Sequence, residues 1–208
     1  MQLWQIEELL ADIKTFENPN VFLEQYTTPP HIAAYLVQIA ENSFGDLKGK
    51  LVADLGCGTG MLCAAIHYFG ASSIVGVDLD ESALSIAKQN IVKCDLQVDL
   101  VQSNISELFF KSAMFDTVVM NPPFGTRRKG IDVVFLETAI EVTYPEGSIY
   151  SLHKTCTRNY LHKKMLQWKC EGEVLGKFMF NLSKTFSFHR KESMDIEVDL
   201  WRIKKKKR

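Results

Sequence analysis

The spacing of the hydrophobic residues changes along the chain and divides it into two parts. Near the N-terminus, apolar side chains such as Leu3, Ile6 and Leu10 recur at helical spacing, which predicts a helix over 3–16. Two prolines at 29–30 suit the first turn of a second helix that ends near residue 42. Farther along, short apolar runs alternate with amphipathic segments. These runs predict five strands, at 51–55, 73–78, 96–102, 115–120 and 147–154.

The alternation of strands and helices predicts the fold class. Helices are expected between and after the strands, at 61–70, 80–94, 130–143 and 157–170. Strands separated by helices pair in parallel, so we expect an α/β fold with a mainly parallel, seven-stranded sheet and helices on both faces. The last two apolar stretches, 173–182 and 193–203, have no helix between them, which predicts an antiparallel C-terminal strand. We expect one domain over 1–208, with an N-terminal helical segment at 1–48 and a basic tail at 202–208.

Composition narrows the classes of function. A chain of 208 residues that is 46% hydrophobic and 24% charged suits a soluble globular domain. Acidic residues at Glu7, Glu8 and Asp12 argue against a secretory signal, and no apolar run reaches the roughly 18 residues of a membrane span. We therefore expect no membrane association and a location in the nucleus and cytoplasm. The five cysteines show no CxxC spacing, which predicts reduced, mostly buried thiols and no metal site.

A glycine-rich turn, "DLGCGTG" at 54–60, joins the strand at 51–55 to the next helix. Gly56, Gly58 and Gly60 permit a tight backbone and close approach of a ligand at the carboxyl ends of parallel strands. Asp78 ends the following strand, 22 residues after Gly56, where a carboxylate can accept from both hydroxyls of a ribose. The spacing differs by one residue from the dinucleotide fingerprint, which leaves a nicotinamide enzyme as an alternative. The pattern predicts a nucleoside-type cofactor.

These features resemble the class I S-adenosylmethionine-dependent methyltransferases, which have a Rossmann-like fold. The resemblance implies that the glycine turn passes under the methionine and ribose of the cofactor and that Asp78 holds the ribose. Asp54 then orders the turn or contacts the methionine amine, although it could also simply cap the next helix. The adenine is expected near Asn104, which stands where many relatives have Asp, and near the backbone N–H of Ile105.

The hexapeptide "MNPPFG" at 120–125 follows the strand at 115–120. It resembles the motif of methyltransferases that act on planar amino groups, such as the exocyclic amines of adenine and cytosine or glutamine amides. The Asn121 side-chain oxygen and the Pro122 carbonyl can accept the two N–H bonds of such an amine, and Pro123 stiffens the loop. Phe124 can stack on the base, which contributes about 1–3 kcal/mol. Transfer then depends mainly on in-line positioning of the amine.

Five stretches together resemble the methyltransferase-like protein 5 family over most of the chain: "FLEQYTTPPHIAA", "ADLGCGTG", "DTVVMNPPFGT", "YSLHK" and "FHRKESMDIEVDL". The resemblance implies methylation of the exocyclic amine of one adenosine in small-subunit (18S) ribosomal RNA. It places the catalytic element at Asn121 to Phe124. It implies cofactor contacts from Gln25, Thr28, Gly56, Thr59, Met61, Asp78, Asn104 and Ile105.

The same resemblance implies a partner, a small zinc-binding activator subunit that is shared among several methyltransferases and pairs with the sheet edge. The strand at 96–102 is the expected edge, and an unpaired apolar edge favours such an added strand. Basic residues around the predicted site fit an RNA substrate. These are Arg127, Arg128, Lys129, Lys154, Arg158, Lys163, Lys164, Arg190 and Lys191. For His153 and His189 we expect packing or hydrogen bonding and no catalytic role.

Three alternatives share part of this pattern. Protein-glutamine methyltransferases share the NPP-aromatic motif, but they usually carry a sizeable helical domain, and only about 50 residues precede the first strand here. DNA adenine methyltransferases normally add a target-recognition region, for which we find no room. A non-catalytic RNA-binding subunit would have no reason to keep Asn121, Asp78 and the glycine turn together.

Overall fold

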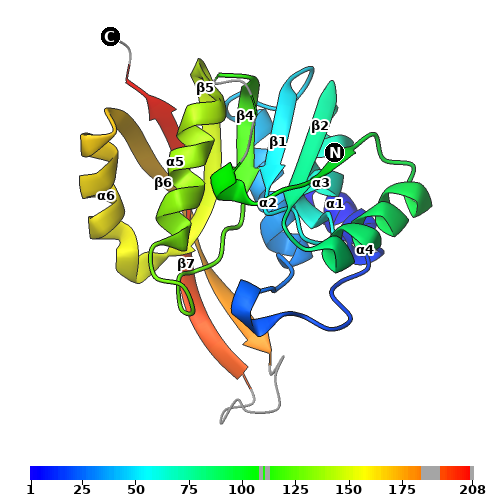
Figure 1. The fold of residues 1–208 in the computed structure, drawn as a ribbon. Helices are drawn as coiled ribbons and strands as arrows, with labels where there is room; N and C mark the ends of the chain where they lie inside the picture. Colours follow the sequence, from blue (N-terminus) through cyan, green and yellow to red (C-terminus); the bar gives the residue numbers. More distant parts are fainter. Residues whose placement is uncertain (108–109, 111–112, 184–192, 207–208) are drawn as a thin grey trace.

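The structure, a computed structural model, describes residues 1–107, 110, 113–183 and 193–206. In this part of the chain, seven strands form one sheet in the order β3-β2-β1-β4-β5-β7-β6 (Figure 1). The first five strands in the chain pair in parallel, and β7 runs antiparallel to both β5 and β6. The predicted fold class is therefore confirmed. The strands are β1 (Leu51–Leu55), β2 (Ser73–Asp78), β3 (Asp99–Gln102), β4 (Phe115–Met120), β5 (Thr143–Lys154), β6 (Cys170–Ser183) and β7 (Ser193–Lys205).

Helices cover both faces of the sheet, with α5 and α6 on one side and α1 to α3 on the other (Figure 1). The α-helices are α1 (Leu3–Ala11), α2 (Pro30–Asn42), α3 (Met61–Tyr68), α4 (Glu81–Lys93), α5 (Ile131–Val142) and α6 (Arg158–Gln167). Three short 3-10 helices are η1 (Val21–Leu23), η2 (Ile105–Glu107) and η3 (Thr155–Thr157). Neighbouring β4 residues Val118 and Val119 belong to the two different cores, as the period-2 geometry of a strand requires.

Several elements differ from their predicted bounds: the helix predicted over 157–170 ends at Gln167, and β5 begins at Thr143, four residues before its predicted start. Two of the shorter elements have identifiable reasons. The first helix ends at Ala11 because the buried Asn90 side chain bonds both the N–H and the C=O of Lys14, which replaces helical hydrogen bonds there. The edge strand begins at Asp99 rather than at residue 96, since Asp95 adopts a left-handed conformation (φ 51°) after α4. β3 pairs only with β2, so the predicted edge position is confirmed.

Asp46, which lies in the loop between α2 and β1, ties this loop to β5 and β7. Its carboxylate accepts a 2.6 Å hydrogen bond from the hydroxyl of Tyr150 on β5. It also accepts from Nε and Nη2 of Arg202 on β7, at 3.2 and 3.1 Å. The Arg202 guanidinium stacks on the Phe44 ring, 3.8 Å from its centroid. This network couples the loop to two neighbouring strands of the sheet.

Tyr150→Phe is expected to lower the free energy of unfolding by about 2 kcal/mol, because the lost hydroxyl donates to an ionised carboxylate. Urea denaturation followed by circular dichroism measures the change. Tyr144→Phe is the matched control, since Tyr144 is 44% exposed. A Tyr150→Phe protein as stable as this control would show that the network contributes nothing to stability.

Candidate functional site

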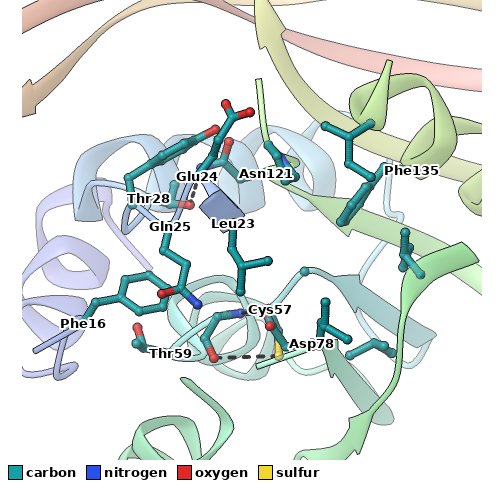
Figure 2. A pocket seen from close by; sticks show the side chains of 18 of the residues that line it. Phe16, Leu23, Glu24, Gln25, Thr28, Cys57, Thr59, Asp78, Asn121 and Phe135 are labelled. Atoms are coloured by element: carbon teal, nitrogen blue, oxygen red, sulfur yellow. Dashed lines mark hydrogen bonds between the residues drawn. The ribbon is translucent and has the colours of Figure 1, made fainter. Parts of the chain in front are cut away.

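A pocket opens at the carboxyl ends of β1, β2 and β4, where parallel sheets of this type bind ligands (Figure 2). It holds about 1090 Å³ of empty space including its open mouth, which is ample for a nucleoside-sized ligand. The predicted site residues that line it are Gln25, Thr28, Gly56, Gly58, Thr59, Met61, Asp78, Asn104, Ile105, Asn121 and Pro123. Asp54, Gly60, Pro122 and Phe124 lie next to the pocket without lining it.

The glycine turn is shaped by two aromatic rings, Phe16 and Phe135, which lie on opposite sides of the pocket (Figure 2). Gly56 has a φ of +76°, and a Cβ there would lie 2.9 Å from Cε1 of Phe135. Gly58 has a φ of +53°, and a Cβ there would lie 2.8 Å from Cζ of Phe16. Both the backbone conformation and the space therefore require glycine at these two positions.

Asp78 braces the same turn from the end of β2. One carboxylate oxygen accepts from the backbone N–H of Gly58 at 2.8 Å, and the other accepts from the backbone N–H of Asp80 at 2.9 Å. Burial raises the pKa of Asp78, while these N–H donors oppose the shift. A carboxylate has about four acceptor positions. Asp78 therefore keeps acceptor capacity for a ligand's hydroxyl groups while it fixes the turn.

Asp54 lies beneath the turn and is completely buried. Sγ of Cys63 donates to one of its oxygens at 3.1 Å, and the other oxygen, Oδ1, has no partner. The N-cap residue of α3 is Gly60, and no side chain caps this helix, so the capping role considered for Asp54 is not observed. Burial, together with the nearby charge of Asp78, raises the pKa of Asp54 to about 7.

This raised pKa predicts a pH-dependent stability. The folded-state value of about 7 exceeds the value of an unfolded aspartate, about 3.9. The folded protein therefore binds an extra proton between these values, and its stability falls as the pH rises through that window. We expect the thermal midpoint of the wild type to fall between about pH 5 and pH 8, and Asp54→Asn to flatten that fall. Parallel pH profiles for the two proteins would contradict this prediction.

The loop after β4 brings Asn121 to the pocket with an unpartnered oxygen. Its Nδ2 donates to Oγ1 of Thr28 at 2.9 Å, and its buried Oδ1 has no hydrogen-bond partner among the described residues. The Pro122 carbonyl next to it accepts from the Tyr26 hydroxyl at 2.9 Å. The two atoms predicted to accept a substrate's N–H bonds thus come from adjacent residues, and one of them is entirely free.

Phe124, whose predicted role is to stack on the base, lies next to the pocket within an aromatic cluster. Its side chain is 7% exposed and stacks on Tyr26, with ring centroids 4.9 Å apart, while Phe180 covers its edge. The ring is buried because it joins this aromatic cluster. One face of Phe124 is therefore already covered, and stacking on a base stays a prediction.

Two predicted cofactor residues use their amides within the protein. Asn104 caps η2: its Oδ1 accepts from the backbone and hydroxyl of Ser106, at 3.2 and 2.9 Å. Nε2 of Gln25 donates to Asp80 at 2.6 Å, which ties the N-terminal segment to the end of β2. Asn104 is therefore placed at the pocket with its amide oxygen already engaged.

Several pocket residues escape detection from sequence, because they come from distant segments. In the sequence, Phe16 and Phe135 fit the ordinary apolar pattern of two predicted helices, although both line the pocket. Asn90 lies outside the pocket lining, and its signal in the sequence is a polar residue on the apolar face of a predicted helix. It is 1% exposed, and its Nδ2 donates to the carbonyls of Lys14 and Thr59, which ties the N-terminal segment to the glycine turn.

The basic residues near the site fall into different environments. Arg128 lines the pocket, and Nζ of Lys154 lies 5.9 Å from the centroid of the Phe124 ring. Nε and Nη2 of Arg158 both donate to the buried Asp199 at 2.7 Å, so this cation is paired within the fold. The predictions for Arg190, Lys191 and His189, and the last two residues of the tail, lie outside the described residues.

His153 lies inside the fold and away from the pocket lining. It is 1% exposed, its Nε2 shares a 2.7 Å hydrogen bond with the Ser151 hydroxyl, and burial lowers its pKa to about 3. It is therefore neutral at physiological pH, in agreement with a packing role. The five cysteines are free, and Cys57, Cys63 and Cys170 are buried.

The described residues contain neither a cluster of metal-binding side chains nor a helix that could span a membrane. Within this part of the chain, no three His, Cys, Asp or Glu side chains gather in a way that could hold a metal ion. None of its helices has the length and apolar character to cross a bilayer.

Comparisons with known proteins agree with this geometry. The family described as "Methyltransferase small domain" matches residues 16–167. The chain is 43% identical to the Drosophila melanogaster rRNA N(6)-adenosine-methyltransferase Mettl5, with 98% of this chain and 96% of that protein covered. It is 43% identical to the Danio rerio rRNA N(6)-adenosine-methyltransferase METTL5, with coverage of 98% and 99%. The crystal structure of Pyrococcus horikoshii PH1948, a candidate RNA methyltransferase, is similar at a TM-score of 0.86 and 32% identity, covering 99% and 97% of the two chains.

Proposed function

Since the chain belongs to the METTL5 family of rRNA N(6)-adenosine-methyltransferases, we propose that it methylates the exocyclic amine of an adenosine in ribosomal RNA. The methyl donor in this proposal is S-adenosylmethionine, and the target is small-subunit (18S) RNA. The observation that carries the proposal is the unpartnered Oδ1 of Asn121. A buried acceptor without a donor costs about 1–3 kcal/mol, and an arriving N–H group removes that cost.

The residues at the glycine turn fit the proposed cofactor. Gly56 and Gly58 let the turn pass close to the Phe135 and Phe16 rings of the pocket, and Asp78 presents a carboxylate where a ribose can donate two hydroxyls. Gln25, Thr59, Met61 and Ile105 complete the walls. When bound, S-adenosylmethionine supplies an electrophilic methyl group on its sulfonium. The protein's part is to hold the acceptor nitrogen in line with that group.

Asn121 and Pro122 perform this orienting step. An exocyclic amine is a poor nucleophile because its lone pair is delocalised into the ring, and two acceptors outside the ring plane favour the pyramidal, reactive nitrogen. The Asn121 Oδ1 and the Pro122 carbonyl are these acceptors, and the Pro122–Pro123 sequence keeps the carbonyl fixed. Correct positioning can lower a barrier by about 7–11 kcal/mol. No strong base is needed before transfer, since the nitrogen becomes acidic once it is alkylated.

The adenosine must leave any stack to reach Asn121, so the substrate site is a single-stranded or flipped nucleotide. Arg128 at the pocket and Lys154 beside Phe124 are the described cations best placed to attract the flanking phosphates.

We also propose that a small zinc-binding activator subunit adds a strand at β3 and that the heterodimer works in the nucleus and cytoplasm. The support is the position of β3 at the sheet edge, where the partly buried Leu100 and Val101 have a neighbouring strand on one side only. Co-expression should raise the yield of soluble protein, because a partner strand covers the open edge. A fully active, soluble monomer would contradict the partner proposal.

The test of the proposed function supplies labelled S-adenosylmethionine to the purified protein, with and without the activator, together with total RNA, DNA or protein fractions. We expect label in RNA and none in the other fractions. The Asn121→Ala protein, prepared identically, controls for contaminating methyltransferases. Label in protein glutamine would support the protein-methylating alternative, and no label in any fraction would support a non-catalytic subunit. Either result would overturn the proposal.

A further inference from the structure

Tyr26 lines the pocket and also contacts the loop that carries Asn121. Its hydroxyl donates to the Pro122 carbonyl at 2.9 Å, and its ring stacks on Phe124 with an interplanar angle of 25°. Tyr26 lines the pocket, whereas Phe124 lies behind it. A residue of the pocket lining is therefore joined to the Pro122 loop from a segment 96 residues earlier in the chain.

The Tyr26 ring is held on two sides by other rings. Besides its stack on Phe124, it packs edge-on against Phe180 of β6, with centroids 5.4 Å apart. Phe180 is itself 1% exposed and contacts Phe124 at 6.0 Å. Because two separate elements confine the ring, its hydroxyl is fixed before any substrate arrives, and little side-chain entropy remains to be lost.

Two proline pairs stiffen the backbones that meet here. Thr28 precedes Pro29–Pro30 and Asn121 precedes Pro122–Pro123, so both are held in extended conformations. Tyr26 and Thr28 are two residues apart in an extended segment and can therefore project to the same side. Tyr26 bonds the carbonyl of Pro122, and Thr28 bonds the amide nitrogen of Asn121 at 2.9 Å. Each of the two predicted acceptors thus has its own support from the N-terminal segment.

The hydrogen bond from Tyr26 leaves the Pro122 carbonyl able to act. A carbonyl oxygen has two acceptor positions, of which the tyrosine uses one. Burial, and secondarily the charge of Glu24, raises the pKa of Tyr26 above its usual value, so the hydroxyl stays protonated and keeps donating. The carbonyl is therefore held by one bond, and its oxygen has the chemical capacity to accept a second.

We propose that Tyr26 is a positioning residue for methyl transfer, which holds the Pro122 carbonyl through its hydroxyl in the orientation that accepts a substrate N–H. This inference rests on the proposed function, and it extends the catalytic machinery beyond the NPPF loop. It predicts that the hydroxyl affects the rate of transfer without affecting how tightly cofactor or RNA binds.

Tyr26→Phe tests this, because it keeps the stacked ring and removes only the donor. We expect kcat to fall about 3–10-fold, the equivalent of one ordinary hydrogen bond. The KM for RNA and the cofactor Kd should stay at wild-type values. Tyr35→Phe is the matched control, since the Tyr35 hydroxyl also donates to a backbone carbonyl, that of Leu175, at 3.4 Å and outside the pocket lining. Its kcat should equal that of the wild type.

A double-mutant cycle separates positioning from simple structural support. Removing the hydroxyl in an Asn121→Ala background should cost less than it does in the wild type, because the amine clamp is already broken. An unchanged kcat in Tyr26→Phe, or an equal cost in both backgrounds, overturns the inference and leaves the proposed function intact. A wild-type protein that methylates no adenosine overturns both.

Discussion

Asn121→Ala is expected to lower the single-turnover rate of RNA methylation at least about 100-fold, because the substrate amine loses the acceptor that orients it. The affinity for S-adenosylmethionine should change little. Asn121 reaches the rest of the protein through one side-chain hydrogen bond, to Thr28, and its Oδ1 is unpartnered. The truncation therefore removes an acceptor without breaking a network that holds the glycine turn.

Rapid-quench kinetics and isothermal titration calorimetry measure the two quantities separately. Asn159→Ala is the matched control, since Asn159 is an exposed asparagine on α6, and it should behave as the wild type. Equal losses of rate and cofactor affinity in Asn121→Ala would mean that Asn121 is structural. A rate close to the wild-type value would remove it from the mechanism.

Asp78→Ala is expected to weaken cofactor binding at least about 100-fold, since two hydrogen bonds from ribose hydroxyls to a carboxylate are together worth at least about 3 kcal/mol. The substitution also removes the acceptor for the backbone N–H groups of Gly58 and Asp80, so the turn itself loses support. The effect on affinity should exceed any effect on the rate at saturating cofactor.

Calorimetric titration with S-adenosylmethionine and with its demethylated product, S-adenosylhomocysteine, checks this, because the two ligands carry the same ribose. Both should weaken alike. Glu81→Gln controls for the loss of one negative charge near the turn, since Glu81 is exposed and does not line the pocket. An Asp78→Ala protein that binds both ligands as tightly as this control would place the ribose elsewhere.

Local signals in the sequence predict most of the sheet. β1 and β2 have the predicted bounds, because short apolar runs flanked by glycine, aspartate and loop residues leave no other good choice. β3 was predicted three residues too long, since a left-handed Asp95 ends the preceding turn and a propensity argument does not detect such a residue. The antiparallel pair β6–β7 followed from the missing helix between the two stretches.

The sequence predicts the site residues that belong to one continuous motif. It does not predict side-chain orientations that depend on contacts between distant segments. The few residues around the glycine turn, Asp78 and Asn121 are enough to predict the proposed role of each. The burial of Phe124 depends on Tyr26 and Phe180. Both are distant from Phe124 in the sequence and contact it only in the folded chain. Tertiary contacts, which no local pattern encodes, decide these orientations.

The proposed function specifies that the methyl group is transferred to N6 of adenosine. Digesting the methylated ribosomal RNA to nucleosides and separating them by chromatography with mass spectrometry identifies that atom directly. We expect N6-methyladenosine from the wild-type protein and at most a trace from Asn121→Ala. N1-methyladenosine, a methylated ribose or a methylated cytidine as the product would contradict it.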